Sequence, residues 1–173
     1  EEEIASVNVG VYCFTYEMLY KALTEMGPDD HQVYHISDQI DRLGSENHRI
    51  AAIAVDQPQE GQRIVSRADL AEATAFIVQR NCQRLMRAGV TLLDPSNTYV
   101  EEDVEVGRDT IIYPGCVLQR GTRVGERCIL YPGCRLVRTI VGDEAVVEQT
   151  VAEDSVVAPG SHVGPYAHLC PDA

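Results

Sequence analysis

Positive charge is scarce in this sequence, and long hydrophobic runs are absent from it. The 173 residues include 14 lysines and arginines against 27 aspartates and glutamates, which gives a formal net charge of −13 at pH 7. Such a chain repels phosphate backbones and anionic lipid headgroups alike. Its longest aliphatic runs, such as residues 50–55, fall far short of the roughly 20 residues that a membrane-spanning helix needs. We therefore expect neither nucleic acid nor a membrane as a partner.

The sequence also lacks the marks of an exported, disulfide-bonded protein. It begins Glu-Glu-Glu-Ile, without a methionine and without the basic and apolar regions of a signal peptide. Its six cysteines include no Cys-x-x-Cys pair. Because thiols stay reduced in the cytoplasm, we expect a cytoplasmic protein with reduced cysteines. We also expect the first residue to be an internal position of a longer protein.

What the sequence does have is a repeat. Residues 106–118, Val-Gly-Arg-Asp-Thr-Ile-Ile-Tyr-Pro-Gly-Cys-Val-Leu, return eighteen residues later as Val-Gly-Glu-Arg-Cys-Ile-Leu-Tyr-Pro-Gly-Cys-Arg-Leu. A shorter period of six runs inside this repeat, with one aliphatic residue in each hexad. The aliphatic residues are Val100, Val106, Ile112, Leu118, Val124, Leu130 and Leu136, and after short phase shifts Val141, Val147, Val151, Val157, Val163 and Leu169.

A small residue follows most of these aliphatic residues by four positions, and we expect both to point inward. The small residues are Thr110, Cys116, Thr122, Cys128, Cys134, Ala145, Ser155, Ser161 and Ala167. Three hexads then form one coil of a triangular prism, a parallel β-helix. Residues 100–173 supply about four coils. Because no capping element follows the last hexad, we expect the β-helix to continue in a longer protein.

The sequence before residue 90 has a different pattern. Residues 6–14 and 49–55 are predicted strands, and residues 16–25 and 36–43 are predicted helices. Strands that alternate with helices are typical of an α/β domain. Residues 68–88 then predict a helix of about 30 Å that serves as an arm between two domains.

Five segments occur in the order that a known family has them. They are Asn8-Val-Gly10, Tyr34-His-Ile-Ser-Asp38, Ser66-Arg-Ala-Asp-Leu70, Leu85-Met-Arg-Ala-Gly-Val-Thr-Leu-Leu-Asp-Pro95 and Gly164-Pro-Tyr-Ala-His-Leu-Cys-Pro171. In these segments, and in the phase-shifted hexads, the chain resembles the bifunctional bacterial N-acetylglucosamine-1-phosphate uridyltransferase/glucosamine-1-phosphate acetyltransferases. The resemblance covers essentially the whole sequence.

The resemblance implies a fold and a function. Residues 1–66 are expected to be the C-terminal part of an α/β nucleotidyltransferase domain, 67–89 a linker helix, and 90–173 the first coils of a left-handed β-helix acetyltransferase domain. The family makes UDP-N-acetylglucosamine for the cell envelope. It acetylates glucosamine 1-phosphate from acetyl-CoA and then transfers a uridylyl group from UTP with Mg²⁺. The resemblance further implies a cytoplasmic homotrimer assembled through the β-helix.

Few of the family's site residues have a counterpart here. Asn8 falls on a position that contacts the sugar nucleotide. Val65 stands where the family has an asparagine that helps to hold Mg²⁺, and a valine side chain offers no oxygen. His31-Gln32-Val33 replaces Gln-Gly-Glu, and Cys170 stands where an arginine contacts the sugar phosphate. The family's general base lies beyond residue 173. We therefore assign no catalytic and no metal residue, and expect this chain alone to be inactive.

Two other functions stay open. The chain is either a non-catalytic trimeric remnant or scaffold, which Val65 and Cys170 favour, or part of another sugar-1-phosphate nucleotidyltransferase with a β-helix tail, related to glucose-1-phosphate adenylyltransferase. Cys170 is also a candidate nucleophile, although no base is predicted beside it.

Two further pairs of residues deserve a site hypothesis. Some trimeric β-helix proteins bind zinc between subunits through three histidines, which makes His162 and His168 candidate ligands on neighbouring corners of the prism. Tyr113 and Tyr131, one coil apart, predict a surface aromatic ladder.

Overall fold

The computed structural model describes residues 8–25, 35–46 and 48–171. It divides into two compact units, residues 1–63 and residues 64–173, and each is described by itself. The replaced segment at residues 31–33 lies outside the described residues.

The described part of the first unit is helical. Helix α1 spans Tyr16–Thr24, α2 spans Ile36–Ser45, and a 3₁₀ turn, η1, spans Pro58–Gly61. Thr15 begins α1 as its N-cap, because its hydroxyl accepts a hydrogen bond from the Met18 amide. The two helices are joined by ion pairs, of which Lys21 Nζ to Glu46 Oε2 is 2.5 Å long. The two predicted helices are thus confirmed.

The two predicted strands are wrong where the structure describes them. Residues 8–14 and 49–55 form no strand, and Val11 and Ile53 are 83% and 92% exposed. A strand is stable only when a neighbour accepts its backbone hydrogen bonds and covers its apolar face. The described part of this unit offers no such neighbour, so an α/β nucleotidyltransferase domain is not evident in it.

The second unit begins with the long helix. Helix α3 spans Arg67–Arg87, and Ser66 and Asp69 form a reciprocal capping box at its start. Gly89, with φ of 98°, follows its end. The predicted arm is confirmed as a helix. Its last turns pack on the first coil of the solenoid through Cys82 and Leu85, which are 0% and 1% exposed.

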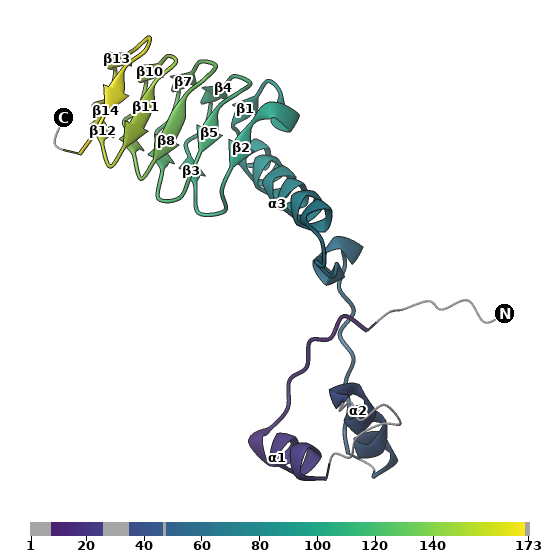
Figure 1. Ribbon diagram of the computed structural model, residues 1–173. Helices are drawn as coiled ribbons and strands as arrows, with labels where there is room; N and C mark the ends of the chain where they lie inside the picture. The colour runs from purple at the N-terminus through teal and green to yellow at the C-terminus, as the bar shows by residue number, and fades with distance from the viewer. Residues whose placement is uncertain (1–7, 26–34, 47, 172–173) are drawn as a thin grey trace. The chain divides into compact units, whose positions relative to one another are not determined.

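The remainder is a parallel β-solenoid with three sheets (Figure 1). Sheet 1 contains β1 (Thr91–Leu92), β4 (Ile111–Ile112), β7 (Ile129–Leu130), β10 (Val146–Val147) and β13 (His162–Val163). Sheet 2 contains β2 (Tyr99–Val100), β5 (Val117–Leu118), β8 (Arg135–Val137), β11 (Val151–Glu153) and β14 (His168–Leu169). Sheet 3 contains β3 (Glu105–Val106), β6 (Arg123–Val124), β9 (Ile140–Val141) and β12 (Val156–Val157). The 3₁₀ turn η2, Pro95–Asn97, joins β1 to β2.

The solenoid is longer than the expected four coils from residue 100. Thr91 and Leu92 already pair with Ile111 and Ile112, so sheet 1 has five strands, and sheet 2 has five beginning with β2. The six-residue period did not predict β1. Strand β1 lies twenty residues before its neighbour β4 instead of eighteen, so its inward residue falls outside the period.

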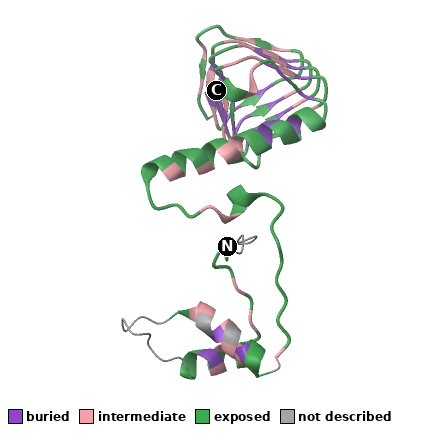
Figure 2. Ribbon diagram, turned by 90° about the vertical axis from the view of Figure 1, so that its right-hand side faces the viewer, coloured by how far each residue is buried: buried purple, intermediate pink, exposed green. Residues whose placement is uncertain are grey.

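The core lies inside the prism (Figure 2). The predicted aliphatic rows are confirmed with one correction, since Ala152 rather than Val151 points inward. Ala152 pairs with buried Leu136, whereas Val151 pairs with exposed Arg135. The inward positions from Val147 to Ala152 and from Ala152 to Val157 are five residues apart, so counting six residues back from Val157 gives Val151 instead of Ala152.

The small inward residues are also confirmed for most positions, and two more were missed. Thr139 and Thr150 are both 0% exposed at shortened hexads. Each hydroxyl donates to a carbonyl two residues earlier, Thr139 to Val137 at 2.9 Å and Thr150 to Glu148 at 2.6 Å. A local hydrogen bond lets threonine fill a tight corner without leaving its hydroxyl unsatisfied.

Gly107 shows how closely the coils stack. A Cβ built on it would lie 2.5 Å from the Gly125 carbonyl carbon and 2.6 Å from the Glu126 nitrogen, both backbone atoms of the next coil. At Gly115 a Cβ would meet nothing nearer than 3.8 Å, although φ is 78°. The first glycine is required by space and the second by conformation.

We expect Gly107→Ala to lower the free energy of unfolding by about 2 kcal/mol or more, because a methyl group there forces two coils apart. Gly115→Ala is the matched control and should cost roughly 1 kcal/mol, the strain of a left-handed alanine. Urea denaturation followed by circular dichroism measures both. Equal effects at the two positions would contradict the stacking argument.

Candidate functional site

Asn8, the predicted sugar contact, lies in an exposed turn rather than on a strand. Its Oδ1 accepts from the Gly10 amide at 2.9 Å, and its Nδ2 donates to the Tyr12 hydroxyl at 2.8 Å. Both ends of the amide therefore already have local partners. A sugar hydroxyl can replace Tyr12 without disturbing the turn, because the Gly10 bond uses the other end. Contact of Asn8 with a sugar stays a prediction.

Val65 lies just before α3 with its side chain 74% exposed. The oxygens nearest to it in sequence hold the helix start, since Asp69 Oδ2 accepts from the Val65 amide at 3.0 Å and from the Ser66 amide at 2.7 Å. These hydrogen bonds lower the pKa of the Asp69 carboxyl. Among the residues that the structure describes, no three His, Cys, Asp or Glu side chains gather to hold a metal. Val65 itself offers no side-chain oxygen to a metal ion.

Cys170 is exposed at the end of the described solenoid. Its Sγ lies 3.7 Å from His168 Nε2, and its carbonyl accepts from the Ser155 hydroxyl at 3.1 Å. A thiol beside an imidazole supplies no guanidinium for a phosphate. His168 is the neighbour that sequence reasoning did not anticipate, although its position two residues earlier on a strand puts it on the same side.

His162 and His168 lie on different sheets, in β13 and β14. His162 Nε2 is 2.9 Å from Glu148 Oε1, which gives it a carboxylate partner on its own sheet. The two histidines therefore do not lie along one edge of the prism.

The stacked side chains of successive coils agree with the sequence. The rings of Tyr113 and Tyr131 stack with their centroids 4.9 Å apart, which confirms the aromatic ladder. Cys116 and Cys134 are buried, free thiols that donate to backbone carbonyls, Cys116 to Tyr131 at 3.2 Å and Cys134 to Val147 at 3.3 Å. The interaction of the two thiols lowers the pKa of Cys134 and, together with burial, raises the pKa of Cys116. Both thiols fill one corner of the prism.

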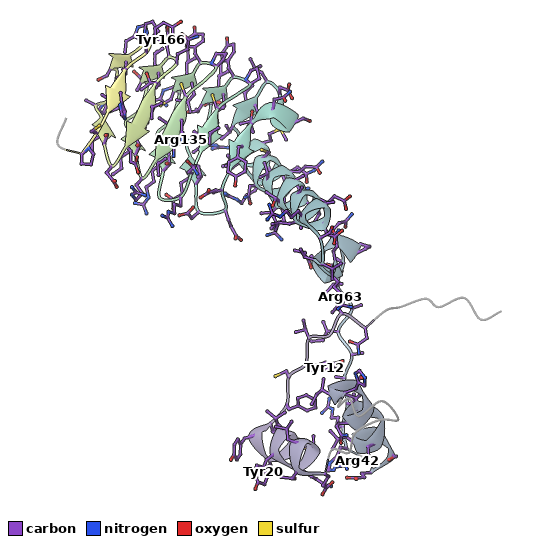
Figure 3. The ribbon with its side chains drawn as sticks, viewed as in Figure 1. Tyr12, Tyr20, Arg42, Arg63, Arg135 and Tyr166 are labelled. Carbon is purple, nitrogen blue, oxygen red and sulfur yellow. The ribbon has the colours of Figure 1, made fainter. Side chains whose placement is uncertain are left out.

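Two hollows on the second unit were not anticipated. The smaller, of about 270 Å³, is lined by polar side chains along sheet 2 and its corner, among them Arg135 (Figure 3) and Arg138. Arg138 donates to Glu153 at 2.8 Å and to Asp154 at 2.5 Å, and the Arg138 hydrogen bond lowers the pKa of the Asp154 carboxyl. Its charge is thus held between two carboxylates.

The larger hollow is a groove of about 590 Å³ between α3 and the first two coils. Its lining is mostly apolar and carries no nucleophile beside a base among the described residues. Leu70, an apolar position of the helix, lines the groove and is 53% exposed, and it was the sequence signal available for this site.

The described part of the chain contains no helix with the length and apolarity to cross a bilayer.

Comparison with known proteins gives consistent matches along the whole chain. The bifunctional protein GlmU of Bacillus subtilis is 39% identical over 176 residues, which cover 100% of this chain and 39% of that protein. The GlmU proteins of Clostridium botulinum and Acetivibrio thermocellus are 37% and 38% identical and cover 99% of the chain. The chain spans 38% and 37% of the length of these two. No family model matches the sequence.

Burial predicts how the thiols react. We expect a maleimide to label Cys13 and Cys170 in the native chain, because both are exposed. Cys82, Cys116, Cys128 and Cys134 should be labelled only after denaturation, because their side chains are buried. Mass spectrometry of tryptic peptides before and after guanidinium treatment measures this. Native labelling of Cys134 as fast as that of Cys170 would show that the solenoid core opens.

Proposed function

Because the chain is homologous over its whole length to a segment of the GlmU proteins, we propose that it is part of an enzyme of UDP-N-acetylglucosamine biosynthesis. The enzyme acetylates glucosamine 1-phosphate from acetyl-CoA and transfers a uridylyl group from UTP. The observation that carries the proposal is the continuity of the match, which runs through the helical unit, α3 and the solenoid. A shared solenoid alone would support only a shared fold.

The domain boundaries follow from this proposal. Residues 1–66 are the C-terminal part of the uridyltransferase domain, 67–89 the linker helix and 90–173 the first coils of a left-handed acetyltransferase β-helix. The capping box at Ser66 and the glycine at 89 support the ends of the linker, because each terminates a helix by a local hydrogen-bonding device. We place the enzyme in the cytoplasm.

The chain's own residues contribute differently to the two reactions. In uridylyl transfer, a sugar phosphate oxygen attacks the α-phosphorus of UTP and pyrophosphate leaves, and Asn8 orients the sugar through its amide. No metal-dependent step is assigned to the described residues. In acetylation, the sugar amine attacks the thioester carbonyl and the thiolate of CoA leaves. The described coils supply no reacting group to this step and act as its rigid scaffold.

The proposal includes a homotrimer formed through the β-helix. The outward side chains of sheet 1 support it, because Ile111, Ile129 and Val146 form an apolar row along the prism. A row of this kind gains stability when a second copy covers it.

A non-catalytic trimeric remnant is the second candidate, and the exposed side chains of Val65 and Cys170 favour it. The two candidates are distinguished by the native gene product, captured from its own cells with an antibody against the solenoid. The enzyme proposal expects an intact mass more than twice the 19.1 kDa of this chain and formation of UDP-N-acetylglucosamine from glucosamine 1-phosphate, acetyl-CoA and UTP. A product with a mass near 19.1 kDa and without either activity would establish the remnant.

In the full-length enzyme, we expect Cys170→Arg to raise the acetyltransferase kcat/KM for glucosamine 1-phosphate about tenfold. A guanidinium at that position supplies charge-assisted hydrogen bonds to phosphate, each about 1.5 kcal/mol or more. Cys13→Arg replaces an exposed cysteine of the first unit and is the control. Steady-state kinetics with varied sugar phosphate measure both variants, and an unchanged KM and kcat in Cys170→Arg would remove this position from the phosphate site.

A further inference from the structure

Two buried cysteines lie one above the other at the corner between sheets 1 and 2. Cys116 precedes β5 and Cys134 precedes β8, and these neighbouring strands pair in parallel with Val117 opposite Arg135 (Figure 1). The Val117 amide donates to the Cys134 carbonyl at 2.8 Å. Both cysteine side chains are 0% exposed. The pair is therefore enclosed in the prism, with its backbones at the spacing of hydrogen-bonded strands, about 4.8 Å.

That spacing lies within the range that a disulfide requires, because bridged cysteines have Cα atoms roughly 4.4–6.8 Å apart. The side chains of the two coils also run in the same direction. Tyr113 and Tyr131, three residues before the two cysteines, stack with ring centroids 4.9 Å apart. Cys116 Sγ lies 3.2 Å from the Tyr131 carbonyl oxygen, which belongs to the coil of Cys134. The Cys116 sulfur thus leans toward the coil that carries the other thiol.

The column of inward residues at this corner holds two thiols and no third. The strand register places Thr98 below Cys116 and Thr150 above Cys134, since each precedes a paired strand of sheet 2. Cys128, which is also buried, belongs to a different corner. Its neighbours in the adjacent coils are Thr110 and Ala145, so no thiol stacks on it. Each cysteine of the pair therefore has one thiol within reach, which is the other.

We propose that Cys116 and Cys134 form a reversible dithiol–disulfide site, which hydrogen peroxide oxidises in the folded chain. The bond ties the coil of β5 to the coil of β8. All six cysteines are free thiols in the structure, which is the reduced state of the site and the state that we expect in the cytoplasm. This inference goes beyond the proposed biosynthetic enzyme and needs none of its substrates.

The order of reaction follows from the two thiols. The interaction with Cys116 lowers the pKa of the Cys134 thiol, whereas the pKa of the Cys116 thiol is raised, so the Cys134 thiolate reacts first. It attacks one oxygen of the peroxide, the O–O bond breaks, and the hydroxide that leaves takes up the thiol proton as water. The Cys116 sulfur then attacks the sulfenic sulfur. The S–O bond breaks as the S–S bond forms, and the hydroxide leaves with the Cys116 proton as a second water. The two thiols lose two electrons, and the peroxide gains them.

Oxidation is expected to stabilise the solenoid. The bond closes the loop from residue 116 to residue 134 in the unfolded chain and lowers the conformational entropy of that state. The folded chain already holds the two coils at this spacing, so the bond requires little movement of its backbone. The direction of the stability change therefore shows whether the disulfide fits the fold.

Peptide mapping tests the proposal on the whole chain. The exposed thiols of Cys13 and Cys170 are first blocked with N-ethylmaleimide in the native state. Excess hydrogen peroxide is then added, and the chain is unfolded, alkylated and digested with trypsin. We expect the tryptic peptides 109–120 and 128–135 to be joined by a bond that dithiothreitol releases. Circular dichroism recorded during the oxidation should stay that of the folded chain.

The variants identify the second sulfur, because peptide 128–135 contains both Cys128 and Cys134. Cys134→Ala should abolish the link. Cys128→Ala is the matched control, since it also removes a buried inward thiol and should keep the link. Oxidation should raise the Tm of the wild type and of Cys128→Ala by about 8 °C and leave that of Cys134→Ala unchanged.

Two outcomes overturn the proposal. A folded chain that stays unlinked, or whose Cys134 is oxidised to the sulfinic acid without a link, shows that the two sulfurs do not meet. A linked chain with a lower Tm than the reduced chain shows that the bond distorts the fold. If Cys134→Ala fails to fold, the fragment spectrum of the linked wild-type peptides decides between Cys128 and Cys134, and a link through Cys128 rejects the site.

Discussion

Every part of the second unit depends on hydrogen bonds between successive coils. Strands of two or three residues cannot persist alone, and each is held by amides that donate to the next coil, as Ile111 does to the Cys128 carbonyl at 2.9 Å. The close spacing of hydrogen-bonded coils leaves room inside the prism for one aliphatic and one small side chain per hexad. It also fixes which glycines cannot be replaced, because at Gly107 the next coil is too near for a methyl group. Inward threonines and cysteines meet the same limit and direct their polar atoms to carbonyls of the corners, as Thr110 Oγ1 does to Gly125 at 2.8 Å.

The stacking has one further consequence at the first coil. Its interior would face water at Val100 and Val104, both 0% exposed, if nothing covered it. The C-terminal half of α3 covers it, and Arg84 donates to the Glu102 and Val104 carbonyls at 2.9 and 3.1 Å. Capping a solenoid removes an open row of backbone groups. The linker helix is therefore part of the solenoid's stability, and its position relative to sheet 2 is fixed by that role.

Sequence reasoning predicted the solenoid well because its determinants are local and repeated. An error at one hexad, such as Val151 for Ala152, is limited by the correct hexads on either side. The helices were also predictable, since Thr15 and Ser66 cap them locally. Strands at 6–14 and 49–55 were predicted from the local residue pattern alone, and a local pattern cannot say whether a partner strand is present. The groove was missed for a related reason, because the exposure of Leu70 depends on where α3 crosses the solenoid, which no local pattern encodes. Asn8 shows that the same holds for a single side chain, since its turn with Gly10 and Tyr12 replaces the expected strand.

Val65 and Cys170 differ from the residues that the resemblance implies at these positions, and their exposure shows whether folding can explain the difference. Val65 is 74% exposed and Cys170 is exposed, so no packed neighbour among the described residues constrains either side chain. Exchange of such side chains changes stability by at most about 0.5 kcal/mol. Folding therefore neither demands these residues nor forbids the asparagine and arginine of the family. A buried substitution is ambiguous, because the fold itself can select it together with its neighbours. At Val65 and Cys170 the fold supplies no such explanation, so packing in the described part of the chain does not account for the residues found there.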